Sequence, residues 1–258
     1  MIILSIDTDW APEAATRRVL EKVRALGLKV TVFFSTPGPL PPWPELEIGC
    51  HPDLSRRRPL AGDQGAALSM AERKHDLAVD QAESSILQEY RRAFPEARAV
   101  RTHRFYWHSD LARNMAQNGF IHDSSMILPY HPNLKGFKSG RLYRWPVWAS
   151  DHLHLARRLP LDRLALPHLD EPGLKIFCFH VAYLYLNAHS LDEFNMIKTR
   201  LGDDDYEAPA GRAPGVWNLF ELLAEKIYRK SKGCWLSEIP AEYLSRGNLD
   251  DCIENEVK

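Results

Sequence analysis

The stretch that decides the fold reads Ile2-Ile-Leu-Ser-Ile-Asp-Thr-Asp-Trp10. Residues 2–6 form a short, almost wholly apolar run, which is typical of a parallel strand buried on both faces of its sheet. Two carboxylates, Asp7 and Asp9, follow at once. A buried strand that ends in acidic residues predicts a site at the carboxyl end of a parallel sheet.

Short apolar runs of this kind recur along the chain and alternate with helical stretches. Further strands are predicted at residues 29–34, 46–49, 99–101, 142–145 and 174–179. Helices are predicted at residues 14–26, 69–93, 110–117 and 215–230. Strand–helix alternation predicts an α/β fold with a parallel sheet. A length of 258 residues suits a single domain over residues 1–258, as in α/β barrels.

Composition excludes several classes of protein. The chain has 33 Lys and Arg against 34 Asp and Glu, so it lacks the basic footprint that general nucleic-acid binding needs. Its apolar runs are far shorter than the ~20 residues of a membrane span. The first residues lack the basic region of a signal peptide. The four cysteines are widely separated, which is typical of reduced thiols, so we expect a cytoplasmic protein.

Acidic, histidine and arginine side chains follow five of the predicted strands. In chain order they are Asp7 and Asp9, His51, Arg101 and His103, Asp151 and His152, and His180. In an α/β barrel, the carboxyl ends of the strands meet on one face, where the active site lies. Each residue taken alone has a plainer interpretation, such as a helix N-cap for Asp9 or a surface position for a histidine. Their joint placement predicts an active site.

The two aspartates carry most of the chemistry. If the strand continues past Asp7, both carboxylates point to the same side of the sheet. Two like charges held close resist joint ionisation, so one pKa rises or both meet a cation. Arg101 is a natural partner for such a carboxylate. Trp10 lies beside them, and sugar rings often stack on aromatic faces, so we expect Trp10 to contact a carbohydrate.

The order of these motifs resembles the NodB-homology polysaccharide deacetylases, carbohydrate esterase family 4. The resemblance rests on Asp7-Thr-Asp9, residues 30–34, Glu47-Ile-Gly-Cys-His51, Arg101 and the late strand that ends in His180, and it covers residues 1 to about 187. It implies a distorted (β/α) barrel of about seven or eight strands. It also implies hydrolysis of the acyl amide, usually acetyl, of an N-acylated amino sugar, with a divalent metal that is commonly Zn²⁺.

The match is clearest to a divergent branch of that family. The segments that carry it are Asp7-Thr-Asp-Trp10, His51-Pro-Asp53, Arg101-Thr-His103, and His180 followed by Tyr185-Leu-Asn187. Proteins of this branch look like those encoded with enzymes of O-antigen and lipopolysaccharide biosynthesis. The resemblance therefore implies an amino-sugar substrate of surface-polysaccharide biosynthesis. Acetyl and formyl groups both remain open, as do a nucleotide sugar, a lipid-linked sugar and a polymer.

Two departures from the family pattern affect the metal site. Thr8 separates the aspartates that are normally adjacent, and Ser55 occupies the position of the second histidine of the His-Ser/Thr-x-x-His motif. The ligand set that the resemblance implies is therefore Asp9, His51 and His103. Asp53 is the alternative third ligand, since carboxylate oxygen also suits zinc.

The resemblance also implies the catalytic roles. Asp7 is the expected general base, although Asp7 and Asp9 could exchange roles. Arg101, or a carboxylate partner such as Asp151, is expected to hold Asp7 in place, and His180 to protonate the leaving amine. A backbone N–H near Phe105 would stabilise the oxyanion. Trp10, Phe105 and Asn187 are the expected substrate contacts.

Two other functions remain open on the sequence alone. One is a metal-dependent phosphoesterase on another α/β barrel, which usually needs two metals ~3.5–4 Å apart. The other is an inactive sugar-binding relative, suggested by Ser55 in place of a histidine. One metal per chain together with acid release from an acylated sugar separates the deacetylase from both. The oligomeric state is not readable from the sequence.

Overall fold

A computed structural model describes residues 1–38, 46–54, 70–203, 206–207, 212–229 and 233–245. Its core is one sheet of nine strands in the order β6-β7-β5-β4-β3-β2-β1-β9-β8. The strands are β1 (Ile2–Asp7), β2 (Val30–Phe34), β3 (Leu46–Cys50), β4 (Ala99–Val100), β5 (His122–Asp123), β6 (Phe137–Ser139), β7 (Leu142–Arg144), β8 (Val147–Ser150) and β9 (Lys175–His180). All neighbours pair in parallel except β6 and β7.

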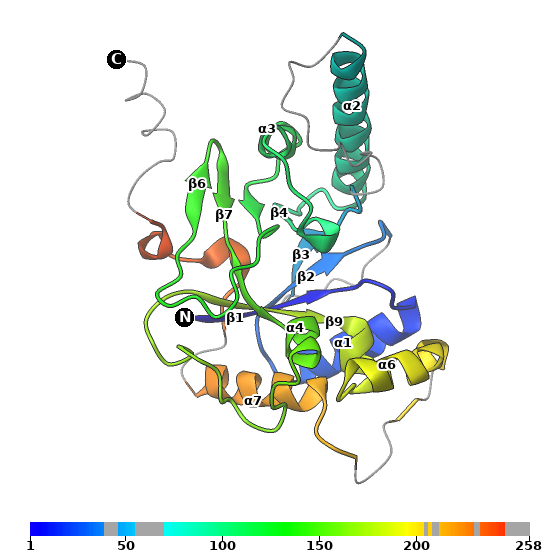
Figure 1. Ribbon diagram of the computed structural model, residues 1–258, viewed down its shortest axis with the longest axis vertical. Coiled ribbons are helices and arrows are strands. Elements are labelled where there is room, and N and C mark those ends of the chain that lie inside the picture. The colour runs from blue at the N-terminus through cyan, green and yellow to red at the C-terminus, as the bar shows by residue number, and fades with distance from the viewer. Residues whose placement is uncertain (39–45, 55–69, 204–205, 208–211, 230–232, 246–258) are drawn as a thin grey trace.

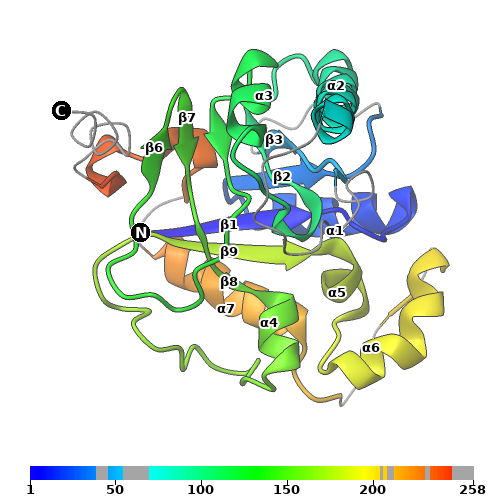
Figure 2. The same ribbon diagram turned by 45° about the horizontal axis from the view of Figure 1, so that its top comes forward.

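The sheet curls so that the chain just past β5 returns to β8, the strand at one edge. β7 and β8 lie near opposite ends of the strand order, yet only Trp145 and Pro146 separate them in the chain. Ile127, just past β5, bridges in parallel to Val147 at the start of β8, and Leu128 N–H donates to the Val147 carbonyl at 2.9 Å. This confirms the predicted α/β class and the distorted barrel, whose curl is visible in Figures 1 and 2.

Helices cover the outside of the curled sheet. They are α1 (Glu13–Ala25), α2 (Met70–Ala93), α3 (Leu111–Gln117), α4 (Asp151–Ala156), α5 (Val181–Leu186), α6 (Leu191–Ile197) and α7 (Val216–Tyr228). Helices α1 and α7 lie along the strands β1 and β9, while α2 and α3 lie toward β3 and β4 (Figures 1 and 2). Each of α1 and α7 buries an apolar stripe at helical spacing, such as Val19 and Val23 in α1.

Most predicted elements form within a few residues of their predicted bounds, including the long helix predicted at 69–93, which is α2. Strands β5, β6 and β8 and helices α4, α5 and α6 were not predicted from the sequence. These strands have two to four residues and these helices six or seven, too short for a periodic pattern. That residues 1–258 form a single domain stays a prediction.

No helix in the described part of the chain is both long and apolar enough to cross a membrane.

Candidate active site

The parallel pairing of β1 with β9 brings the first candidate residues together. Asp7 is the last residue of β1 and pairs in register with His180, the last residue of β9. On its other side β1 pairs with β2, which in turn pairs with β3, and His51 follows the end of β3. Because these strands run in parallel, their polar ends converge at one mouth of the barrel, as the sequence predicts.

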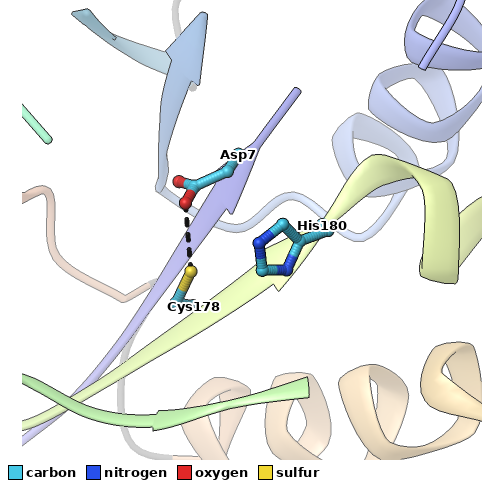
Figure 3. Close-up of side chains that lie close together, drawn as sticks. All are labelled: Asp7, Cys178 and His180. Atoms are coloured by element: carbon cyan, nitrogen blue, oxygen red, sulfur yellow. Dashed lines mark hydrogen bonds between the residues drawn. The ribbon is translucent and has the colours of Figure 1, made fainter. Parts of the chain in front are cut away.

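Asp7 is buried and holds two hydrogen bonds from deeper in the barrel. Arg101 Nη1 donates to Oδ1 at 2.7 Å, and the Cys178 thiol donates to Oδ2 at 3.2 Å (Figure 3). Burial raises the pKa of Asp7, but the Arg101 charge, helped by His51, outweighs it and the net pKa is lowered. Asp7 is therefore ionised and fixed in orientation.

Arg101 is fully buried and supported on every side. Its Nη2 donates to Ser5 Oγ at 2.9 Å and to Ser124 Oγ at 3.0 Å, and its guanidinium stacks 4.2 Å from the Phe33 ring. Of the two residues expected to hold Asp7, the structure places Arg101 against it. The side chain is locked by these partners, so it positions Asp7 as a rigid unit.

Asp9, His51 and His103 form the first group of possible metal ligands. Asp9 Oδ2 lies 2.9 Å from His51 Nε2 and 3.2 Å from His103 Nδ1. All three side chains are buried, and their ligand atoms lie within 4.8 Å of one another. The alternative ligand Asp53 belongs to neither of the two such groups among the described residues.

The hydrogen bond that His51 makes through Nδ1 indicates that the group Asp9, His51 and His103 suits a cation. His51 Nδ1 lies 2.6 Å from the Arg101 carbonyl oxygen, which can only accept, so Nδ1 carries the proton. The Nε2 that faces the Asp9 carboxylate therefore needs either a second proton or a shared cation. A histidine fixed through its other nitrogen to a backbone carbonyl is the usual arrangement behind a metal ligand. Two imidazoles and a carboxylate also suit zinc.

A second group, Asp7, Cys178 and His180, does not suit a cation (Figure 3). Asp7 is already paired with Arg101, whose charge repels a metal ion. Burial raises the pKa of the Cys178 thiol well above its usual value, so the sulfur stays protonated. Figure 3 shows the thiol turned to Asp7, with His180 beside them on β9.

His180 is held by a carboxylate. Its Nδ1 lies 2.7 Å from Asp151 Oδ1, and its backbone N–H donates to Asp151 Oδ2 at 2.6 Å. Asp151 is buried at the first turn of α4. Burial lowers the pKa of His180, but the Asp151 charge and hydrogen bond outweigh it and raise the pKa to about 9. His180 is therefore protonated at neutral pH. Asp151, proposed from the sequence as a partner of Asp7, holds His180 instead.

These groups open into one pocket of about 330 Å³. It is lined by Asp7, Asp9, Trp10, His51, Arg101, Thr102, His103, Arg104, Phe105, Ser150, His152 and His180. Trp10 is 57% exposed and its ring stacks on His180 at 5.6 Å between centroids and 10° between planes. Its φ of 57° is in the left-handed region, which costs about 1–3 kcal/mol for such a residue.

Two expected substrate contacts differ in placement. Phe105 lines the pocket, but its backbone N–H already donates to Thr102 O at 3.1 Å, so this N–H is not free to serve as an oxyanion donor. Asn187 does not line the pocket. It ends α5 with a φ of 46°, and its Oδ1 accepts from Trp217 N–H at 3.0 Å. Its role in the structure is to join α5 to the start of α7.

Three pocket residues, Thr102, Arg104 and Ser150, were not among the predicted site residues, and His152 was noted after a predicted strand but given no role. His152 follows Asp151 directly, and its Nδ1 lies 2.9 Å from the Tyr183 hydroxyl. The signal that could have found Ser150 is its position at the end of β8, a strand too short to predict. Arg104 lies next to a predicted ligand but carries no signal of its own.

A model of the WbmS-like polysaccharide deacetylase family matches residues 4–198. The crystal structure of WbmS from Bordetella bronchiseptica, assigned as a polysaccharide deacetylase of O-antigen biosynthesis, has a TM-score of 0.71 and 18% identity, covering 87% of this chain and 90% of that one. At this identity the likeness concerns the fold. Two further solved structures are more distant. A polysaccharide deacetylase from Mycobacterium smegmatis has a TM-score of 0.44 and 15% identity, covering 96% of this chain and 94% of that one. A family 4 carbohydrate esterase from Streptomyces lividans has a TM-score of 0.39 and 12% identity, covering 83% of this chain and 96% of that one.

No curated protein matches the sequence. The family model nevertheless covers well over half of the chain, and its matched region contains every residue of the pocket. The chain therefore belongs to the WbmS-like family of polysaccharide deacetylases, hydrolases that act on acetylated sugars.

Proposed function

We propose that this protein hydrolyses the N-acyl amide of an amino sugar, by default an acetyl amide and alternatively a formyl amide, in surface-polysaccharide biosynthesis. The observation that carries the proposal is the grouping of three units in one pocket. These are a ligand set (Asp9, His51 and His103), an ionised carboxylate (Asp7) and a protonated imidazole (His180). Metal-dependent amide hydrolysis uses a metal ligand set, a general base and a general acid, and these three units can supply them.

The ligand set would hold a divalent metal, with zinc as the first candidate. The chemistry supplied by such a metal would be a bound water with a pKa of ~7 and a polarised amide carbonyl. The protein supplies the fixed orientation of the ligands. His51 is locked through Nδ1 to the Arg101 carbonyl, so the same residue that positions Asp7 also positions a ligand.

Asp7 is the proposed general base. Its carboxylate is ionised and lies 3.8 Å from His51 Nε2, so a water held near the ligand set is within reach of it. As the water oxygen bonds to the amide carbon, its proton passes to Asp7. The same geometry favours Asp9 as the ligand, because Asp9 contacts both histidines at hydrogen-bond distance whereas Asp7 is paired with Arg101.

His180 is the proposed general acid. Its protonated ring lies in the pocket, with Nδ1 engaged by Asp151 and Nε2 left to face the substrate. When the carbon–nitrogen bond breaks, His180 gives its proton to the departing nitrogen. The products are a carboxylic acid and a free amino sugar, so atoms and charge balance. Trp10, stacked on His180, would offer a face to the sugar ring.

Free thiols support a place in the cytoplasm, as proposed from the sequence. Cys50, Cys178 and Cys234 are all free, and the first two are buried. Cysteines that remain unpaired are typical of reducing compartments. A cytoplasmic enzyme would act on a precursor sugar.

The structure offers little support for the two alternative functions, an inactive sugar-binding protein and a binuclear phosphoesterase. Ser55 lies outside the described residues, but the described residues already provide three ligands without it. A binuclear phosphoesterase needs a second cation site, and the only other ligand group among the described residues, Asp7, Cys178 and His180, has its carboxylate paired with Arg101.

The decisive experiment measures metal content by mass spectrometry and acid release from acylated amino sugars. Wild type, His51→Ala and His103→Ala are compared after incubation with zinc. About one metal per chain and acid release in wild type, both lost in the two variants, is the expected result. A wild type that binds no metal, or that holds two metals and hydrolyses phosphoesters, contradicts the proposal.

A further inference from the structure

We propose that Arg104 binds an anionic group of the substrate, so that the amino sugar carries a carboxylate or a phosphate beside the acylated nitrogen. This inference rests on the deacetylase function proposed above and adds the class of sugar. Arg104 is exposed, lines the pocket, and directly follows the ligand His103. Its charge therefore lies at the mouth of the reacting site.

The charges of the pocket are matched in pairs, with one exception. Arg101 is 2.7 Å from Asp7, and His180 is 2.7 Å from Asp151. Asp9 is in contact with His51 and His103. Arg104 has no carboxylate within ion-pair distance among the residues that the structure describes. An arginine presents a planar fork of donors that fits the two oxygens of a carboxylate or phosphate.

The backbone fixes Arg104 at this place. Arg104 has φ 58° and ψ 22°, and the next residue, Phe105, has φ 55°. Two successive left-handed residues other than glycine are strained, and such strain persists where the surroundings impose it. Here the turn is closed by Phe105 N–H to Thr102 O at 3.1 Å and by Thr102 Oγ1 to Tyr106 O at 2.6 Å. Arg104 is thus presented from a rigid turn.

The chemistry of the ligand follows from this position. A neutral N-acylated hexosamine offers hydroxyls and one amide, neither of which needs a full positive charge. A cation that has no carboxylate partner among the described residues gains most from an anionic oxygen. Two sources have that oxygen: a carboxylate on the sugar ring, as in a uronic acid, or a phosphate on the anomeric carbon, as in an activated sugar.

The test compares four substrates with zinc-loaded enzyme. They are N-acetylglucosamine, its 1-phosphate, UDP-N-acetylglucosamine and N-acetylglucosaminuronic acid. Wild type should favour at least one anionic sugar over the neutral one by about tenfold or more in kcat/KM, mainly through KM, as a charge-assisted hydrogen bond gives. Arg104→Gln should abolish the preference, and Arg104→Lys should restore part of it. The uronic acid and the phosphates separate the two sources.

Arg163→Gln is the matched control, because Arg163 is exposed, pairs with its neighbour Asp162 at 3.6 Å and does not line the pocket. It makes the same change in net charge and should leave the preference intact. Equal loss on all four sugars in Arg104→Gln, or no preference in wild type, overturns the inference while the deacetylase function stands. If wild type hydrolyses none of them, the function proposal fails, and calorimetric binding of the same sugars to wild type and Arg104→Gln decides the role of Arg104.

Discussion

Two largely buried pairs at the carboxyl ends of the neighbouring strands β1 and β9, Asp7–Arg101 and Asp151–His180, have the same contact distance of 2.7 Å and opposite effects on pKa. Arg101 cannot lose its proton, so the interaction appears as a lowered pKa of Asp7. The imidazole can lose its proton, so the charge of Asp151 appears as a raised pKa of His180, to about 9. One kind of ion pair thus leaves an ionised carboxylate and a protonated imidazole side by side at neutral pH, which are the states that the proposed base and acid need.

The largest expected effect comes from removing the base. Asp7→Asn should lower kcat by about 10³-fold, within the range for loss of a general base, because the amide cannot accept the water proton. Metal content should stay near wild type. Steady-state kinetics with metal analysis on the same protein preparation measures both.

The matched control is Asp9→Asn, which should lose activity and metal together, since Asp9 contacts both histidines. If Asp7→Asn loses the metal and Asp9→Asn keeps it, then Asp7 is the metal ligand and Asp9 is the general base. Thermal melting of both variants separates these outcomes from unfolding.

The second effect is on stability and follows from removing the cation of the Asp7–Arg101 pair. Arg101→Met leaves the buried Asp7 carboxylate without its cation and should reduce the free energy of unfolding by about 3–5 kcal/mol. The lowered pKa of Asp7 contributes stability above its unfolded pKa of about 4, and this is lost as the pH falls through the folded pKa. The difference between wild type and variant should therefore be large at pH 7 and shrink on acidification.

Urea unfolding at pH 7 and at lower pH measures this difference. A difference that stays constant with pH would show that Arg101 acts through packing on Phe33 rather than through the Asp7 charge.

The third effect concerns the other pair. Asp151→Asn should lower kcat by about 10²-fold and move the basic limb of the pH–rate profile to lower pH. The sign follows from the pKa: His180 is protonated below about 9 because Asp151 raises its pKa, and burial alone would lower it. A pH–rate profile of the variant whose basic limb stays near pH 9 would remove His180 as the acid. His152→Gln is the control, because its side chain contacts Tyr183 rather than Asp151.

The sequence was sufficient for most of the fold because long apolar runs have few alternatives. Strands β1, β2, β3 and β9 have five or six residues, and their patterns predicted their place. For β1, β3 and β9 the sequence also showed the acid or histidine at the strand end. The closure of the barrel was not predictable, since it depends on β5, β7 and β8, which pair through two to four residues each. Such strands form because the sheet already holds their neighbours.

Which residues belong to the site was easier to predict from the sequence than which of their side chains form pairs. Strand ends identified Asp7, Asp151 and His180 as neighbours, but which carboxylate serves which cation depends on register, and register is not local in sequence. The last residues of β1 and β9, Asp7 and His180, pair in register. Helix α4 begins at Asp151, and the carboxylate of Asp151 accepts from the backbone N–H of His180 and contacts its ring. Arg101, which directly follows β4, instead donates to the carboxylate of Asp7.

The smallest predicted effect tests a feature that only the Asp7 side has, the thiol of Cys178 (Figure 3). Cys178→Ala removes a donor from Asp7 Oδ2 but leaves the Arg101 bond, so kcat should fall only a few-fold. Stability should fall by about 1–2 kcal/mol from the lost hydrogen bond and packing. Cys178→Ser keeps a donor and should retain more of kcat than the alanine variant. Cys50→Ala is the control for stability, because that buried thiol packs in the core. If Cys178→Ala lowers kcat as much as Asp7→Asn, the thiol rather than Arg101 sets the orientation of the base.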